Sequence, residues 1–311
     1  MKVSDQFVDI NNSRQNILTM LSSVENPILL IVHGGPGSPD RPLVCKYNSE
    51  LSKYYTVVCW DQRGSGLSYS NANKENGLTI ELMLSDLKEL VVFLLAKYKK
   101  EKLYIAGHSW GAYLGLRFVS EYPQYVKYYI GTGQGISSFV DEIYKYNFVL
   151  DKAEKLNDVK VVQKLKDFGA PSGMEYYNQS EEASAYVGKL VHKYGGYIHP
   201  ESRLNMNTYF SEYLKFYRHN IFRVLAGINY SVKSLNSQIN SEDKITPITE
   251  INVPILLISG EQDFVCPVPA VRQWFEKLVA PKKNFVIIKK AAHMVNFEKP
   301  SEWNNELIKI L

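Results

Sequence analysis

The stretch Leu103-Tyr104-Ile105-Ala106-Gly107-His108-Ser109-Trp110-Gly111 is the part of this 311-residue chain that decides its fold. It begins with the apolar residues typical of a buried strand, and residues with helical spacing follow it from Ala112 to Glu121. Between strand and helix, the pattern G-x-S-x-G is typical of a serine on a sharp, strained turn. The glycines two positions before and after the serine avoid clashes in such a turn. The motif in this context predicts Ser109 as a nucleophile at the carboxyl edge of a sheet.

Similar short apolar runs recur on both sides of this motif, and most lead through a glycine-containing loop into a stretch with helical spacing. Runs that are apolar on both faces favour central strands of a mostly parallel sheet covered by helices, which indicates an α/β protein. The expected strands are 28–32, 56–60, 103–106, 126–130, 255–258 and 285–288, and the expected helices include 82–98, 112–121, 268–278 and 301–310.

The strand pattern stops between about residues 134 and 246. Polar, aromatic-rich segments with helical spacing replace it, and they hold half of the chain's 22 tyrosines. We therefore predict a core formed by residues 1–133 and 247–311, with residues 134–246 inserted as a helical cap. Because large caps often gate access, we expect this insertion to limit solvent entry to Ser109.

Composition excludes several other classes of protein. The chain has 36 Lys plus Arg against 32 Asp plus Glu, an excess too small for a nucleic-acid-binding surface. The N-terminus lacks an apolar signal core, and the longest strongly apolar run, 28–32, is too short to cross a bilayer. Three cysteines without paired spacing indicate neither a disulfide framework nor a zinc site. We expect a soluble, cytoplasmic protein with no metal, cofactor, nucleic-acid or membrane partner, and the oligomeric state stays open.

A nucleophilic serine needs a base, and the base needs an acid that orients it. His293 follows the last predicted strand by a short loop, at the sheet edge where Ser109 should emerge, whereas the other histidines belong to other motifs or to the cap. Asp263 follows the strand 255–258 and is the preferred acid. Glu261 is its rival, and Asp263 is favoured because it lies deeper in the loop. The predicted catalytic residues are Ser109, Asp263 and His293.

Acyl transfer also needs hydrogen-bond donors for the oxyanion of the tetrahedral intermediate. The backbone N–H of Trp110, directly after the nucleophile, is one candidate. The second should come from the loop 33–37, His-Gly-Gly-Pro-Gly, after the first predicted strand, and we expect it to be the N–H of Gly35. The block 61–68 is expected to support this turn, with Asp61 and Arg63 in charge-assisted hydrogen bonds.

Together these segments resemble the α/β-hydrolase superfamily over nearly the whole chain, including the order Ser, Asp, His. Four blocks look like signature segments of proline iminopeptidases: 33–37, 61–68, 107–111 and Asp263-Phe264-Val265-Cys266-Pro267. The resemblance implies the α/β-hydrolase fold and a cofactor-independent serine hydrolase that acts through an acyl-enzyme. It also implies sensitivity to thiol reagents at Cys266, whereas the residue type by itself favours a small apolar core residue.

The cap departs from the proline iminopeptidase pattern. Those enzymes bind the amino terminus of the substrate through cap glutamates, one of them in a segment resembling Trp-x-x-Trp-Glu, and this cap has no tryptophan. The nearest analogue is the segment that contains Tyr209, Glu212 and Tyr213. Glu175 and the pair 181–182 are further candidates. Each of these acids is also interpreted as an ordinary solvated helix charge.

Three functions therefore remain open. The first is an aminopeptidase similar to proline iminopeptidases that acts on small peptides. The second is a carboxylesterase or amidase for a small aromatic or acyl substrate, which would suit a cap rich in Tyr and Phe. The third is a non-catalytic binding protein on a hydrolase scaffold. In each case the expected partner is a small molecule or a short peptide.

Overall fold

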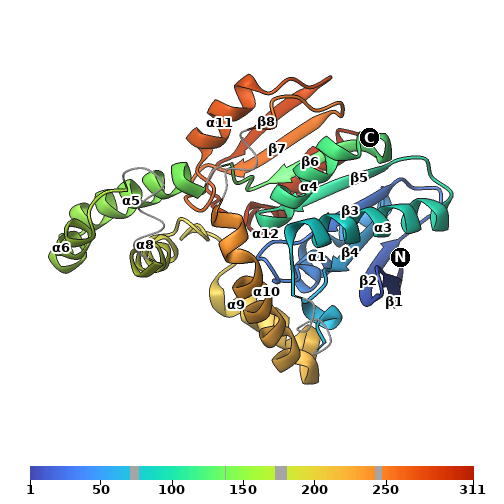
Figure 1. Ribbon diagram of the computed structural model, residues 1–311, viewed down its shortest axis with the longest axis horizontal. Helices are drawn as coiled ribbons and strands as arrows, with labels where there is room; N and C mark the ends of the chain where they lie inside the picture. Colours follow the sequence, from blue (N-terminus) through green and yellow to red (C-terminus); the bar gives the residue numbers. More distant parts are fainter. Residues whose placement is uncertain (71–76, 137, 172–180, 242–246) are drawn as a thin grey trace.

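A computed structural model describes residues 1–70, 77–136, 138–171, 181–241 and 247–311 (Figure 1). Its centre is an eight-stranded sheet in the order β1-β2-β4-β3-β5-β6-β7-β8. The strands are β1 (Lys2–Ile10), β2 (Ser13–Leu21), β3 (Ile28–Val32), β4 (Thr56–Asp61), β5 (Leu103–His108), β6 (Val126–Thr132), β7 (Ile255–Gly260) and β8 (Lys283–Ile288). The core helices are α1 (Arg41–Tyr47), α3 (Ile80–Tyr98), α4 (Trp110–Glu121), α11 (Val268–Lys277), α12 (Val295–Glu298) and α13 (Pro300–Ile308).

The six strands from β4 to β8 in sheet order run parallel, which confirms the predicted mostly parallel α/β sheet. Strands β3, β4, β5 and β7 are buried along their whole length, because helices cover both faces. One apolar cluster joins the sheet to α3, α4 and α11, and a second joins the other face to α1 and α13. This arrangement brings the carboxyl ends of the parallel strands together at one edge.

The sequence patterns did not predict the N-terminal hairpin. Strands β1 and β2 pair antiparallel around Asn11 and Asn12, both with positive φ, and β2 then pairs antiparallel with β4. Most of β1 is exposed, and its sequence KVSDQFVDI is largely polar. Without a continuous apolar run, only the Asn-Asn turn and the alternation near Phe7 to Ile10 pointed to a hairpin.

Among the described residues between β6 and β7, which we expected to form the cap, there are five α-helices. They are α5 (Ser138–Lys155), α6 (Val159–Phe168), α8 (Glu181–Lys193), α9 (Met206–Tyr217) and α10 (Ile221–Ser241). Figure 1 shows α5, α6 and α8 projecting to one side as a lobe, while α9 and α10 lie together below the sheet. The α5–α8 lobe has its own apolar cluster, whereas α9 and α10 pack on the cluster of the core. Across the described ranges, no helix is both long and apolar enough to cross a bilayer.

Candidate active site

Ser109 occupies the turn between β5 and α4. Its φ of 54° and ψ of −117° are strained for a non-glycine residue, and its side chain is only partly buried. The two glycines of the motif are required by close contacts. A Cβ on Gly107 would overlap the backbone of Gly111, and a Cβ on Gly111 would overlap the carbonyl oxygen of Val32. The turn is therefore pressed against β3, and the serine hydroxyl is held at the carboxyl edge of the sheet.

His293 and Asp263 form a buried pair on the loops after β8 and β7. The Nδ1 of His293 lies 2.9 Å from Oδ2 of Asp263. The other oxygen, Oδ1, accepts hydrogen bonds from the backbone N–H groups of Val265, at 2.9 Å, and Cys266, at 2.8 Å. Because the carboxylate only accepts, it fixes the proton of His293 on Nδ1 and leaves Nε2 as the basic nitrogen. Glu261, the rival acid, is exposed.

The end of β6 lies between the serine and the histidine. The backbone N–H of Ser109 donates to the carbonyl of Thr132 at 2.9 Å. The next residue, Gly133, has a φ of +54°, and a Cβ there would lie 2.9 Å from Cε1 of His293. The ring centroids of His108 and His293 are 5.0 Å apart. The sheet thus brings the predicted serine, histidine and aspartate to one edge.

The glycine-proline loop passes directly beside the nucleophile. A Cβ on Gly34 would lie 3.3 Å from Cβ of Ser109, and Gly35 has a φ of +116° and precedes a cis peptide bond. In the described part of the chain, the amides of Gly35 and Trp110 have no hydrogen-bond partner. Two free N–H groups near a serine can bind an oxyanion.

Gln62 joins this loop to the turn of the nucleophile. Its amide nitrogen donates to the carbonyl of His33 at 2.9 Å, and its carbonyl oxygen accepts from the indole of Trp110 at 2.9 Å. Only Asp61 and Arg63 were expected to support this turn, and Gln62 between them carries no charge or pattern that predicts its role.

The charges of the block 61–68 act as scaffold, each with its own partner. Asp61 pairs with Arg41 at 2.8 Å, and the guanidinium of Arg63 donates to both oxygens of Asp86 at 2.6 and 2.8 Å. All four side chains are buried. Removing one partner of such a pair leaves the other as an uncompensated buried charge, which is strongly destabilising. Each pair therefore favours the conformation of the loop in which both partners meet.

A second histidine–carboxylate pair lies beneath the turn of the nucleophile. Burial alone would lower the pKa of His108, but the carboxylate of Asp40, whose Oδ2 is 3.5 Å from Nδ1, raises it above the usual value. The Nε2 of His108 lies 3.1 Å from the carbonyl oxygen of His293. His108 therefore links the glycine-proline loop, the nucleophile strand and the loop of His293.

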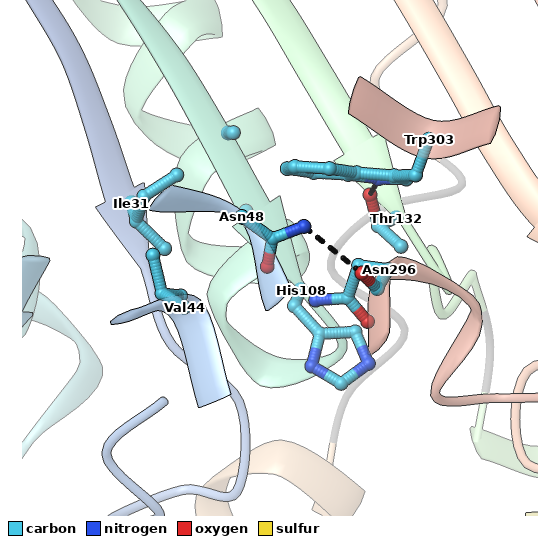
Figure 2. Close-up of a pocket in the computed structure, with 9 residues that line it drawn as sticks. Ile31, Val44, Asn48, His108, Thr132, Asn296 and Trp303 are labelled. Carbon is cyan, nitrogen blue, oxygen red and sulfur yellow. Dashed lines mark hydrogen bonds between the residues drawn. The ribbon is translucent and has the colours of Figure 1, made fainter. Parts of the chain in front are cut away.

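Figure 2 shows the small pocket that His108 borders on the inner side of the turn. Asn48 donates to the backbone carbonyl of Asn296 at 3.0 Å, and the indole of Trp303 donates to the hydroxyl of Thr132 at 2.9 Å. These bonds fix α12 and α13 against α1 and the end of β6, below the loop that carries His293.

A short cap segment, residues 196–199, is hydrogen-bonded to both loops of the histidine–aspartate pair, and we call it the cap strap. The carbonyl of Gly196 accepts from the N–H of Phe264 at 3.1 Å, and that of Tyr197 accepts from the N–H of Met294 at 3.3 Å. The ring of Tyr197 lies 5.7 Å from the ring of His293. The strap therefore covers the histidine and fixes the loops on either side of it.

Glu298 connects the strap to the loop of His293. Its carboxylate accepts from the N–H of His199 at 2.7 Å and from the N–H of Ala292 at 3.0 Å. Burial raises the pKa of Glu298 to about 7, although these two hydrogen bonds act in the opposite direction. The carboxylate thus holds the residue next to His293, and its protonation changes near neutral pH.

The cap residues predicted to bind substrate lie in different environments. Glu212 accepts from Lys46 at 2.8 Å and from Lys215 at 3.1 Å, so its charge is already neutralised. Tyr209 donates to Tyr213 at 3.0 Å, and Tyr213 donates to the carbonyl of Pro39 at 2.7 Å, beside the glycine-proline loop. Glu175 lies outside the described residues. This placement does not favour Glu212 as a ligand for an ammonium group.

A different pair of cap acids lies near the aspartate loop, at the start of α5. Asp141 and Glu142 are both buried, and Oε1 of Glu142 accepts from Lys145 at 2.8 Å. A Cβ on Gly135 would lie 3.5 Å from Sγ of Cys266 and 3.9 Å from Oδ2 of Asp141, so the acids lie next to the loop of the histidine–aspartate pair. Asp141 and Glu142 were not predicted as site residues, because their sequence pattern is typical of ordinary charges on a helix. Among the described residues, no group of His, Cys, Asp and Glu is arranged to hold a metal ion.

Comparisons with known proteins identify the family and the fold. Residues 27–300 match the family described as alpha/beta hydrolase fold. The chain is 32% identical to the Probable aminopeptidase YbaC of Bacillus subtilis over 96% of this chain and 93% of that protein. It is 23% identical to the proline iminopeptidase of Heyndrickxia coagulans over 96% of each chain. The crystal structure of a proline iminopeptidase-related protein from Thermus thermophilus superposes with a TM-score of 0.66 at 18% identity, over 100% of this chain and 98% of that chain.

The contact of Gly111 with β3 gives a test of the turn. We expect Gly111→Ala to lose activity and to destabilise the chain by about 1–3 kcal/mol, because the added methyl group forces backbone shifts in a packed core. In Gly188→Ala nothing lies within 4 Å of the new methyl, so this helical control should gain about 0.5–1 kcal/mol. Urea unfolding measures both. Equal stability changes in the two variants would show that the turn is not packed as described.

The raised pKa of Glu298 predicts a pH dependence of stability. Because the folded-state pKa is above the ordinary 4.5, the stability due to its proton is fully present below about pH 4.5 and is lost as the pH rises through about 7. Glu298→Gln should lower stability by about 1–3 kcal/mol, since its amide leaves one backbone N–H unpaired, and should flatten the loss between pH 4.5 and 7. Thermal unfolding across this range, with the exposed Glu302→Gln as control, tests it. Parallel curves for wild type and Glu298→Gln would contradict the assignment.

Proposed function

Because this chain belongs to the alpha/beta hydrolase fold family and is a hydrolase, we propose that it is a serine hydrolase whose nucleophile is Ser109. The observation that carries the proposal is the buried 2.9 Å hydrogen bond between His293 and Asp263, beside a serine with a strained backbone. His293 takes the hydroxyl proton on Nε2 as Ser109 attacks a carbonyl carbon. Asp263 holds the ring in the required tautomer and stabilises the imidazolium that forms.

The reaction then passes through an acyl-enzyme. The tetrahedral oxyanion accepts hydrogen bonds from the amides of Gly35 and Trp110, and loss of one such donor typically costs about 100- to 1,000-fold in rate. His293 returns the proton to the leaving group as the carbonyl re-forms. Water, activated by the same histidine, attacks the ester of Ser109 and releases the acid product.

We assign the substrate class from the cap acids and from the relatives. The preferred substrates are small peptides with a free amino terminus, as the name of the aminopeptidase relative from Bacillus subtilis suggests. A peptide bound at Ser109 presents its ammonium group a short distance from the reacting carbonyl. Our proposal is that Asp141, which lies next to the loop of Asp263, and its neighbour Glu142 bind this ammonium group.

The charges around Lys145 support this assignment. Burial would lower the pKa of Lys145, but Glu142 and Asp141 raise it above its usual value, so this lysine lies beside two carboxylates. Among the described residues, Oε2 of Glu142 is buried without a hydrogen-bond partner. A buried carboxylate oxygen is costly unless it is paired, and a substrate ammonium would supply a partner for it.

Removal of the nucleophile tests the reaction class. Ser109→Ala should abolish labelling by a fluorophosphonate probe and lower kcat by at least about a thousandfold, because a triad without its serine retains only binding and oxyanion stabilisation. Ser120→Ala, on the exposed end of the same helix α4, should label and turn over like wild type. An unlabelled wild type rules the proposal out and favours a binding protein. Labelling that survives in Ser109→Ala also rules it out, because the reactive residue is then not Ser109.

Glu142 tests the substrate class. Glu142→Gln should raise KM for alanyl and prolyl arylamides roughly 10- to 100-fold, the value of a charge-assisted hydrogen bond, and leave hydrolysis of p-nitrophenyl acetate unchanged. Glu182→Gln removes an exposed cap acid paired with Lys164 and should change neither. If N-acetylated arylamides are cleaved as fast as the free amines, the enzyme is an esterase or amidase that does not recognise the amino terminus of its substrate.

A further inference from the structure

The positive charge of the chain is concentrated in one part of the cap. Residues 203–233, which contain α9 and most of α10, hold five of the 36 basic residues and one of the 32 acidic residues. The remainder of the chain has 31 of each, so the whole excess of +4 lies in this segment. The single acid, Glu212, is already paired with Lys46 and Lys215. The segment is thus a local cationic region on a protein that is otherwise neutral.

The same two helices expose apolar side chains at helical spacing. On α9, Met206, Phe210 and Leu214 recur every four residues, and Phe210 and Leu214 are 52% and 56% exposed. On α10, Phe222 is 80% and Leu225 is 47% exposed, and Val232 extends the series. Exposed apolar stripes on consecutive helices mark interaction sites in soluble proteins. We call these stripes and the cations between them the α9–α10 face.

The other faces of both helices are already used by the fold. Tyr213 donates to the carbonyl of Pro39 at 2.7 Å, and Ser231 donates to the carbonyl of Gly64 at 3.0 Å. Arg223 donates to the carbonyls of Tyr69 and Leu67 at 2.6 and 2.7 Å, which fixes α10 to the core. Because these bonds already fix the core-facing side of both helices, the exposed stripes are on surface that the fold of this chain does not bury. Figure 1 shows both helices at the lower edge of the molecule.

Three cations of this face have no ion-pair partner among the described residues. Arg203, Arg218 and Lys233 are exposed, and none forms an ion pair with a carboxylate in the described part of the chain. Arg218 lies in the short 3-10 turn, Arg218–Asn220, that joins the two helices. Apolar side chains interspersed with exposed cations are the composition of helices that lie in the interface of an anionic membrane.

We infer that the α9–α10 face binds the surface of a membrane that contains anionic lipids, although the small net charge and short apolar runs of the sequence led us to expect no membrane partner. Phe210, Leu214, Phe222 and Leu225 enter the boundary between headgroups and acyl chains, and Arg203, Arg218 and Lys233 contact lipid phosphates. A second copy of the chain fits less well, because a twofold interface would bring the same cations together. The inference concerns a surface away from Ser109 and does not depend on the proposed peptidase activity.

Vesicle co-sedimentation tests the inference with the full chain. Vesicles made of equal parts phosphatidylglycerol and phosphatidylcholine should bind the protein at low salt and release it at high salt, and vesicles of phosphatidylcholine alone should bind it weakly. Arg218→Gln should weaken binding roughly fivefold, and Phe222→Ser roughly tenfold. Two control variants carry the corresponding losses of a positive charge and of an apolar side chain on exposed residues of the α5–α8 lobe. These variants, Lys160→Gln and Leu156→Ser, should bind like wild type.

Three outcomes would overturn the inference. The first is the absence of binding to the anionic vesicles at low salt, and the second is equal binding to both vesicle types. The third is a dimer in light scattering that Phe222→Ser dissociates, which would assign the face to a second copy. Circular dichroism verifies that each variant is folded. Because the vesicle assay measures binding and not hydrolysis, failure of the proposed hydrolase activity and failure of membrane binding are distinguishable.

Discussion

The constraint on which the site depends is the close approach of the Ser109 turn to β3. Gly111 lies so near the carbonyl of Val32 that no side chain fits between them, and Ser109 takes a strained backbone conformation as a result. Strain of this kind, about 1–3 kcal/mol, persists only where the surroundings determine the conformation. The buried strands β3 and β5 supply that rigidity, so the packing of the sheet directly fixes the position of the nucleophile.

The histidine and the aspartate lie on loops, and loops need separate support to be rigid. Two carbonyls of the cap strap and the carboxylate of Glu298 provide it, since they satisfy N–H groups on both loops. The cap segment 196–199 is therefore part of the framework that holds the loops of Asp263 and His293. The near-neutral pKa of Glu298 makes this support sensitive to pH, and His108 beneath the Ser109 turn, whose pKa is raised by Asp40 against the effect of burial, is a second titrating group beside the site.

The sequence allowed the parallel sheet and the residues at its carboxyl edge to be predicted, because each depends on a local pattern. An apolar run followed by a loop places Asp263 and His293 without any knowledge of the cap. The N-terminal hairpin and the role of Glu298 were not predictable in this way, since polar edge strands lack a strong pattern and backbone hydrogen bonds to a carboxylate join residues far apart in sequence. The same limitation directed attention to Glu212, whose lysine partner Lys46 is distant in the chain.

The buried carboxylates of the chain differ in the positive groups that lie beside them. Asp61 and Asp86 each face a buried arginine, and Asp263 has a histidine and two backbone N–H groups. Glu142 bonds Lys145 through one oxygen, and its second oxygen, like Oδ1 of Asp61, has no hydrogen-bond partner in the described ranges. What distinguishes Glu142 is its place at the start of α5, beside Asp141 and the loop of Asp263, where the ammonium group of a bound peptide would give this oxygen a partner.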